Sequence, residues 1–323
     1  MRIGAQGGVT RRSLLRAGIA TAIGCQAASE KSKVVIARDP ALRGTGNSPD
    51  SVRVLKLLDR AVQSFYASDS PLEAWKTVVK PGETIGLKVN CLSGRGAATS
   101  VVLVEAICER LQQSGIPPQN IVIWDRLNSD LESAGFRITR RDRIRCIGND
   151  TADYGRELAV FGSAGSLLSN TLTRTCDAVI NLPVLKDHGI AGVTLALKNL
   201  FGAIHNPNKY HTSAGDPYVA DVNMFPAIRG KVRLSICDGI TAQYEGGPSY
   251  MPQWSWPHNG LLVARDPVAL DFTGWQILER KRAEKGLKSL RELRREPLYI
   301  ATAADASHRL GTNDPQRIDL VEV

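Results

Sequence analysis

This 323-residue sequence has few cysteines and histidines, and their scarcity excludes several kinds of metal site. It contains six cysteines, no Cys-x-x-Cys pair and five histidines. Cysteine-ligated zinc sites and iron–sulfur clusters need closely spaced cysteines, so the sequence predicts no intrinsic iron–sulfur cluster. The widely spaced Cys91, Cys108, Cys146, Cys176 and Cys237 are expected to be mostly buried small apolar residues. One disulfide in an oxidising compartment stays open.

The sequence also lacks long apolar runs, internal repeats and low-complexity tracts. No run approaches the roughly 18 apolar residues of a membrane-spanning helix, so no transmembrane anchor is expected. The formal net charge is +9, but four arginines and no acid fall in residues 1–28, and nine minus four leaves +5. The basic stretch ERKRAEKGLKSLRELRRE carries acids at helical spacing, which favours a solvated helix face. No aromatic-interleaved basic stripe is present, so nucleic acid is not an expected partner.

Residues 1–28 are predicted to be a bacterial twin-arginine export signal. Arg11 and Arg12 are followed by Leu14, Leu15 and Arg16 and then by a short, weakly apolar run to Gly24. The alternative is a basic amphipathic helix that belongs to the fold. Export would require the twin-arginine export machinery as a partner and would place the protein in the periplasm or cell envelope. Cys25 lacks the usual larger aliphatic residue three positions before it, so a lipoprotein is the lesser alternative.

Alternating apolar runs and helical periodicities predict one α/β domain over residues 33–323. We expect a largely parallel, Rossmann-like sheet flanked by helices, with a loop-rich C-terminal portion. Thr99 is the predicted N-cap of the second helix, and Asp266 caps the helix that Pro267 begins. The predicted strands cover 33–38, a segment ending at 90, 120–125, 178–183, 232–237, 261–264 and 318–323. Helices are predicted at 51–66, from 99 to the breaker at 115–118, at 193–204 and at 267–281.

The stretch NLPVLKDHGIAGVTLALKNLFGAIHN, residues 181–206, places charged groups among apolar neighbours. Lys186 and His188 follow a predicted strand directly, and Lys198 and Asn199 lie on the next helix. Unpaired charges in an apolar setting cost free energy, so these four residues are the candidate catalytic groups. His205, seven residues after Lys198, is expected to project beside it. Ion pairs of Lys186 or Lys198 with Asp187 or Asp177 are the structural alternative.

Other polar residues also follow predicted strands, where ligands of parallel sheets collect. Lys88 and Asn90 share one strand face and are candidate cofactor-binding residues, although Asn90 could equally begin a turn. Glu245, Gly246 and Gly247 form a second candidate cofactor-binding stretch because glycine backbone can approach a ligand closely. The aromatic cluster around it, from Tyr244 to His258, is either a lid over a substrate or a small aromatic core.

Asp238, Asp271 and His205 are candidate ligands of a divalent metal. Asp238 closes a predicted strand and could equally be a turn residue. Asp271 lies on an otherwise apolar side of its helix, so its carboxylate needs a partner, for which a metal or a lysine would serve. The cofactor itself stays unknown at this point.

The motifs GETIGLKVN, INLPVLKDHGIAGVTLALKNLFGAI, CDGITAQYEGGP and ARDPVALD, in this order over roughly residues 80 to 275, resemble domain-of-unknown-function family 362. The resemblance implies an α/β fold, frequent export in a branch like this one, and an unsettled activity. Other members carry a ferredoxin-like four-cysteine insert that this sequence lacks. The stretch from Gly82 to Asp125 is also faintly similar to the amino-terminal part of lactate racemase-like proteins, which carries no catalytic residues over.

These observations predict an exported enzyme that acts on a small anionic molecule. Lys186 and Lys198 would bind or polarise a carboxylate or phosphate, and His188 would be the general acid or base, with metal assistance left open. Hydrolysis, elimination and isomerisation all fit these groups. The first alternative is a periplasmic ligand-binding or cofactor-carrier protein without catalysis. The second is a structural envelope protein with an internal ion-pair network.

Overall fold

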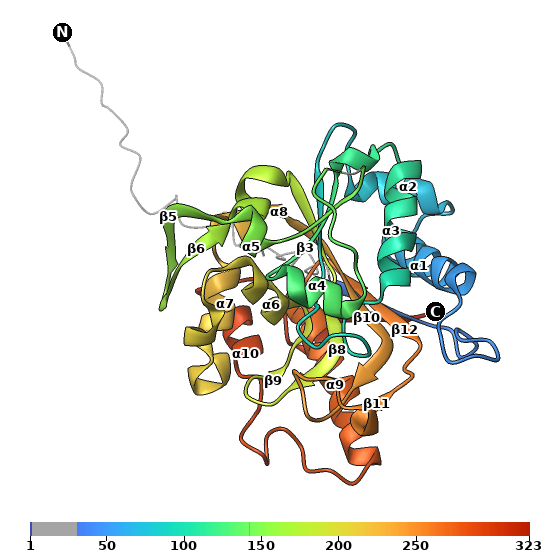
Figure 1. Ribbon diagram of the computed structural model, residues 1–323. Coiled ribbons are helices and arrows are strands. Elements are labelled where there is room, and N and C mark those ends of the chain that lie inside the picture. The colour runs from blue at the N-terminus through green and yellow to red at the C-terminus, as the bar shows by residue number, and fades with distance from the viewer. Residues whose placement is uncertain (2–30, 142) are drawn as a thin grey trace. The chain divides into compact units, whose positions relative to one another are not determined.

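A large, mostly parallel β-sheet forms the centre of the fold (Figure 1). The computed structural model describes Met1 and residues 31–141 and 143–323, so the predicted export signal, Cys25 included, lies outside the described residues apart from Met1. The strands are β1 (Ser32–Arg38), β2 (Ile85–Lys88), β3 (Ile121–Asp125), β4 (Arg145–Gly148), β5 (Tyr154–Phe161), β6 (Ala164–Ser169), β7 (Ala178–Asn181), β8 (Val184–His188), β9 (Gly192–Val193), β10 (Val232–Gln243), β11 (Ser255–Trp256), β12 (Gly260–Ala264) and β13 (Ile318–Glu322).

The main sheet has the strand order β13, β1, β12, β10, β7, β2, β3 and β4. Strand β12 is antiparallel to both of its neighbours, whereas β10, β7, β2, β3 and β4 pair in parallel. Strand β8 continues the direction of β7 and pairs with β10. The carboxyl ends of β2, β3 and β8 therefore meet at one edge of the sheet, where ligands of parallel sheets bind.

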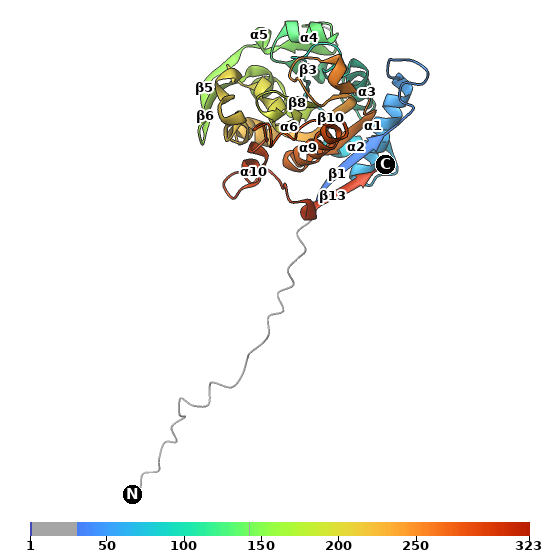
Figure 2. The same cartoon turned by 90° about the horizontal axis from the view of Figure 1, so that it is seen from below.

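Helices cover both faces of this sheet, as the two views in Figures 1 and 2 show. The helices are α1 (Ser51–Tyr66), α2 (Pro71–Val78), α3 (Val101–Gln113), α4 (Asn128–Ala134), α5 (Asn149–Ala152), α6 (Leu195–Asn199), α7 (Tyr218–Asn223), α8 (Pro226–Lys231), α9 (Pro267–Glu284) and α10 (Tyr299–Ala304). Apolar residues of α1, α2 and α3 pack on one face, and those of α6, α7, α9 and α10 pack on the other. The predicted α/β class with a largely parallel, helix-flanked sheet is confirmed.

Most predicted elements are present with small changes at their ends. Helix α9 runs to Glu284, and Asp266 caps it as predicted by accepting hydrogen bonds from the backbone N–H groups of Val268 and Ala269. The predicted cap at Thr99 is wrong, because α3 begins after Ser100. The Thr99 hydroxyl instead accepts the N–H of Asn90 and donates to the carbonyl of Leu182, at 2.8 and 2.7 Å. Thr99 thus fixes the loop after β2 against the end of β7.

The helix predicted over 193–204 is much shorter than expected. Helix α6 ends at Asn199 and continues as a 3-10 helix over Leu200–Ala203. Gly202 lies so close to β2 that a Cβ on it would be 2.7 Å from Lys88 Cε and 2.9 Å from Asp125 Oδ1. Only glycine permits this approach. The 3-10 helix that contains Gly202 winds more tightly than an α-helix, so the chain changes direction before His205.

Two further predictions concern cysteines and membranes. Cys91, Cys108, Cys146, Cys176 and Cys237 are free and buried, as expected of small apolar residues. Within 31–141 and 143–323, no helix has the length and apolar character to cross a membrane.

Candidate functional site

A cavity of about 370 Å³ opens at the carboxyl ends of β2, β3 and β8. Its polar lining includes Lys88, Asn90, Asp125, Lys186, His188 and Lys198, and its apolar lining includes Leu92, Ile190 and Phe201. The structure therefore brings together all four predicted catalytic residues, since Asn199 also lines the cavity, with Lys88 at the end of β2 and Asn90 just after it. A small concave site with a few converging polar groups is typical of ligand binding.

Lys88 forms a buried ion pair at the base of the cavity. Its Nζ lies 2.8 Å from Asp125 Oδ1, and both side chains are almost fully buried. Asp125 also accepts hydrogen bonds from the backbone N–H groups of Cys91 and Arg126. The Lys88 charge is thus neutralised within the protein, and this pair supports the site without adding a free cation to it.

Asn199 joins the ends of two neighbouring strands. Its Oδ1 accepts hydrogen bonds from Lys88 Nζ at 3.3 Å and from Asn90 Nδ2 at 3.0 Å. Its Nδ2 donates to Asn181 Oδ1 at 2.7 Å. Asn199 therefore positions the site. The buried Oδ1 of Asn90 has no hydrogen-bond partner among the described residues, so it is free to accept a hydrogen bond from a bound molecule.

Lys186 is held by neutral oxygen atoms and not by a carboxylate. Its Nζ donates to Ser93 Oγ and, at 2.8 Å, to the carbonyl of Ala97. Burial lowers the pKa of Lys186 to about 8. The predicted alternative of an ion pair with Asp187 is wrong, because successive residues of β8 point to opposite sides of the strand.

Lys198 lies at the end of α6 and also has no carboxylate partner within the part of the chain that the structure describes. Its Nζ is 3.0 Å from Nε2 of His211 and 4.9 Å from the centre of the Phe201 ring. Burial, reinforced by the nearby Lys186, lowers the pKa of Lys198 to about 7. A substantial fraction of this amine is therefore neutral at physiological pH.

Two backbone hydrogen bonds fix the tautomer of His188. Its Nδ1 accepts hydrogen bonds from the backbone N–H groups of Ile190 and Ala191 at 3.2 and 3.1 Å, so Nε2 carries the proton. Burial, together with the charge of Lys198, lowers the pKa of His188 to about 2. His188 is thus a neutral hydrogen-bond donor near neutral pH.

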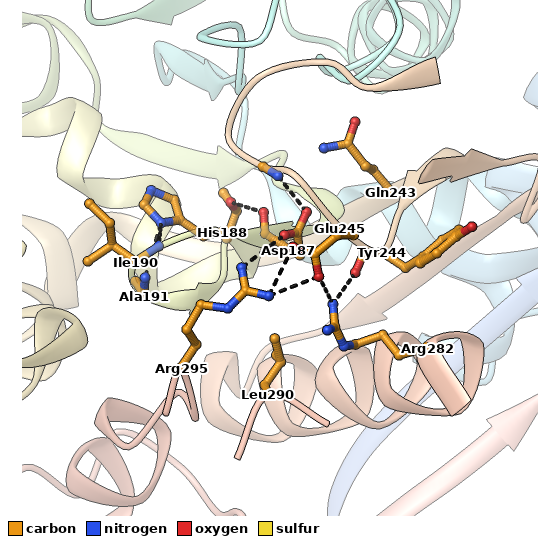
Figure 3. Close-up of polar contacts among 12 residues, drawn as sticks. Asp187, His188, Ile190, Ala191, Gln243, Tyr244, Glu245, Arg282, Leu290 and Arg295 are labelled. Atoms are coloured by element: carbon orange, nitrogen blue, oxygen red, sulfur yellow. Dashed lines mark hydrogen bonds and ion pairs between the residues drawn. The ribbon is translucent and has the colours of Figure 1, made fainter. Parts of the chain in front are cut away.

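The predicted cofactor-binding stretch 245–247 contacts residues of β8 and α9, and Figure 3 shows the ion pairs of Glu245. Glu245 is paired with Arg282 and Arg295, and its two oxygens lie 3.0 and 2.9 Å from Arg295 Nη2. The N–H of Gly247 donates to Asp187 Oδ1 at 2.9 Å, and its carbonyl accepts the N–H of Gly189 at 2.7 Å. Gly246 lies against Met251, since a Cβ on it would be 2.7 Å from Met251 Cγ. None of the three lines the cavity.

The three predicted metal ligands do not come together. Ile236 and Ile240 of β10 belong to the core under α1 and α3, so the intervening Asp238 faces that side, where it accepts the N–H groups of Ser100 and Ile240. Asp271 faces the other side, where its partners are the N–H groups of Ala196 and Leu197 at 2.6 and 3.0 Å. These two backbone N–H groups satisfy its carboxylate.

His205 lies away from Lys198. Its N–H donates to Leu167, and its ring packs edge-on against Tyr154 with 5.1 Å between centres. The predicted convergence of His205 with Lys198 is wrong because the chain leaves helical geometry at Leu200. In 31–141 and 143–323, no three His, Cys, Asp or Glu side chains are grouped as metal ligands would be.

The aromatic cluster is a small core and not a lid. Tyr244 packs against Trp254 and Trp256, with ring centres 5.9 and 5.8 Å apart, and Trp256 packs edge-on against His258. Tyr244 and His258 are buried, and none of these rings lines the cavity.

Some residues of the site were missed from the sequence, among them Asp125, Arg126 and His211. Asp125 ends β3 just as Lys88 ends β2, and the rule that ligands meet at strand ends could have identified it. His211 lies in a loop without a recognisable motif, so only the fold reveals that it reaches Lys198.

The chain belongs to the family described as Domain of unknown function (DUF362), whose model matches residues 85–276. This range contains every predicted site residue from Lys88 to Asp271. The chain is also 29% identical over 261 residues to the thylakoid-associated protein sll1697 of Synechocystis sp. (strain ATCC 27184 / PCC 6803 / Kazusa), covering 75% of this chain and 73% of that protein. The family predicted from the four motifs is confirmed.

Proposed function

We propose that this protein is an enzyme that binds a small anionic molecule in the cavity at the carboxyl ends of β2, β3 and β8. The observation that carries the proposal is the presence of two buried amines, on Lys186 and Lys198, that face one cavity without a carboxylate partner among the described residues. A bound anion would supply the missing counter-charge and would stabilise both ammonium forms. Neutral Lys198 would accept a proton, and protonated Lys186 would donate one.

Three contacts support orientation of the bound molecule. His188 presents Nε2–H as a donor, Asn90 presents an unpartnered Oδ1 as an acceptor, and Arg126 lines the same cavity. The cavity therefore offers a donor, an acceptor and a further cation to a bound molecule.

Anion binding is tested by isothermal titration calorimetry with inorganic phosphate and with lactate as probes. We expect Lys186→Met and Lys198→Met each to weaken binding by roughly ten-fold or more, because each removes a buried cation. The control is Lys56→Met, since Lys56 is exposed on α1 and remote from the cavity lining. Equal affinities for wild type and both cavity variants would contradict the proposal.

The alternative is a ligand-binding or carrier protein that uses the same contacts without catalysis. The lowered pKa of Lys198 favours catalysis, because a binding site for anions gains nothing from an amine that loses its charge near neutral pH.

We also propose export by the twin-arginine route. Arg11, Arg12 and the apolar run that follows support it, and the thylakoid association in the relative's name supports a role at a membrane-bounded compartment. Fractionation of cells that produce the full chain tests the proposal. Replacing both arginines with lysine should retain the protein in the cytoplasm, and unchanged distribution would contradict export by this route.

A further inference from the structure

Lys198 differs from the other two lysines of the cavity in how its amine is held. Lys88 is paired with Asp125 at 2.8 Å and also donates to Val89 and Asn199. The amine of Lys186 donates to two oxygens, on Ser93 and Ala97. Within the part of the chain that the structure describes, the amine of Lys198 has one hydrogen-bond contact, to His211 Nε2 at 3.0 Å.

The tautomer of His211 determines the direction of this bond. His211 Nδ1 is 3.3 Å from the carbonyl oxygen of Asn208, which can only accept, so Nδ1 carries the proton. In neutral His211, Nε2 is then the acceptor and Lys198 the donor. A neutral lysine amine has two N–H bonds and one lone pair. Donation to His211 uses one N–H bond and leaves the lone pair available on the cavity side.

We infer that Lys198 is an amine nucleophile that forms an imine with the carbonyl carbon of a small anionic aldehyde or 2-oxo acid. The inference rests on the proposed function, since it names the substrate class of the same cavity. Nucleophilic lysines are typically desolvated and placed beside a second cationic group, and here Phe201 and Lys186 supply these two conditions. The acid group of the substrate would pair with Lys186 or Arg126, both of which line the cavity.

The atoms and charges of the reaction balance within the cavity. The Lys198 lone pair forms a C–N bond, and the carbonyl π pair moves to oxygen, which takes a proton from the Lys186 ammonium. The amine nitrogen returns one proton to Lys186. A second transfer from Lys186 lets the hydroxyl group leave as water, and the product is a protonated imine. Its remaining N–H has the same acceptor as before, His211 Nε2.

The imine is tested by reductive trapping with sodium cyanoborohydride. The probes are pyruvate and 2-oxo-4-methylpentanoate, the second chosen for the apolar lining, and the modified lysines of the wild-type protein are located by peptide mass spectrometry. We expect Lys198 to be modified at least roughly ten-fold faster than the exposed Lys56, because a larger fraction of its amine is neutral. The Lys198→Arg variant, which keeps a positive charge, should lose this modification, whereas Lys56→Met should retain it.

The pH dependence gives a second readout. The groups that face Lys198 are Lys186 and His188 on β8 and His211 on the following loop. His188 stays neutral above about pH 2, so trapping should rise as Lys198 loses its proton near pH 7 and fall again as Lys186, the proton donor, loses its proton near pH 8. A rate that climbs continuously towards pH 10, as for an exposed lysine, would overturn the inference.

Two controls separate this inference from the proposed function. The corresponding 2-hydroxy acids, lactate and 2-hydroxy-4-methylpentanoate, have no carbonyl carbon at the reacting position, so they can bind but cannot be trapped. Binding of both series without modification at Lys198, or modification mainly at Lys186, would overturn the imine and leave the anion site in place. Absence of binding by either series, measured by calorimetry, would overturn both.

Discussion

Lys198 should lower the stability of the folded protein, so removing it should raise the free energy of unfolding. Lys198 is only 7% exposed, and among the described residues its ammonium form has no anionic partner. Methionine has a similar length and no charge to bury. We therefore expect Lys198→Met to be more stable than the wild type, at the expense of function.

The size of the effect follows from the two pKa values of the amine. The pKa is about 7 in the folded state and 10.5 in the reference state, and one pKa unit corresponds to about 1.4 kcal/mol. Below pH 7 the unfolded and folded states are both protonated, and the variant should gain up to about 5 kcal/mol. Between pH 7 and 10.5 the unfolded state binds more protons, so the wild type becomes more stable as pH rises. The gain should fall to about 3 kcal/mol at pH 8 and below about 1 kcal/mol at pH 10.

Urea unfolding followed by circular dichroism at pH 6, 8 and 10 measures this difference directly. Lys56→Met provides the matched control, because a substitution at an exposed position should change stability by no more than about 0.5 kcal/mol at each pH. A Lys198→Met variant that is less stable than the wild type, or one whose gain does not depend on pH, would refute the reasoning.

Three other substitutions test the supports of the site. Asp125→Ala should lower the free energy of unfolding in urea by about 3 to 5 kcal/mol, because it leaves Lys88 buried without a counter-charge. The double variant with Lys88→Met should recover most of this loss. A double variant as unstable as the single one would count against the pairing. Glu245→Gln should lower the melting temperature, because it weakens hydrogen bonds to two arginines, each of which contributes about 1.5 to 3 kcal/mol. The same variant should bind the anion with an affinity within roughly two-fold of the wild type. A large loss of affinity would show that Glu245 contacts the ligand. Asp266→Ala should cost about 1 to 2 kcal/mol through the lost cap of α9, and an unchanged thermal midpoint would contradict that role.

The sequence was most informative where one strand or helix determines the position of a residue. Lys88 and Asn90 were expected on one face of a strand ending at 90; β2 ends at Lys88, but both side chains contact Asn199. The same local argument located Lys186 and His188 at the end of a strand. These predictions depend on the two-residue period of a strand and on the convergence of parallel strands at their carboxyl ends.

The sequence was least informative where a contact depends on how distant segments pack. The last residues of the stretch ERKRAEKGLKSLRELRRE were expected on a solvated helix, but α9 ends at Glu284 and Arg295 reaches Glu245, fifty positions earlier in the chain. Arg282 is only 1% exposed, although it belongs to the same basic stretch. Charge at helical spacing predicts an exposed face only when no buried acid lies within reach of it.

Asp238 and Asp271 show the same limit for the metal prediction. Both carboxylates are buried, as an ionisable residue in an apolar stretch suggests, but backbone N–H groups satisfy them. The sequence identifies the acidic residues, but it does not show which backbone N–H groups are available to donate hydrogen bonds to them. Asp238 lies on the face of β10 that α1 and α3 cover, whereas Asp271 belongs to α9 on the other side of the sheet, so the two acids cannot share a metal.

The central claim is that the cavity between Lys186 and Lys198 holds a small anion, and crystallography with 4-bromobenzoate tests it most directly. The anomalous signal of bromine locates this carboxylate without ambiguity about the bound molecule. We predict one strong anomalous peak inside the cavity, with a carboxylate oxygen within hydrogen-bond distance of Lys186 Nζ or Lys198 Nζ. Bromobenzoate bound only outside the cavity, with water alone beside both amines, would contradict the account.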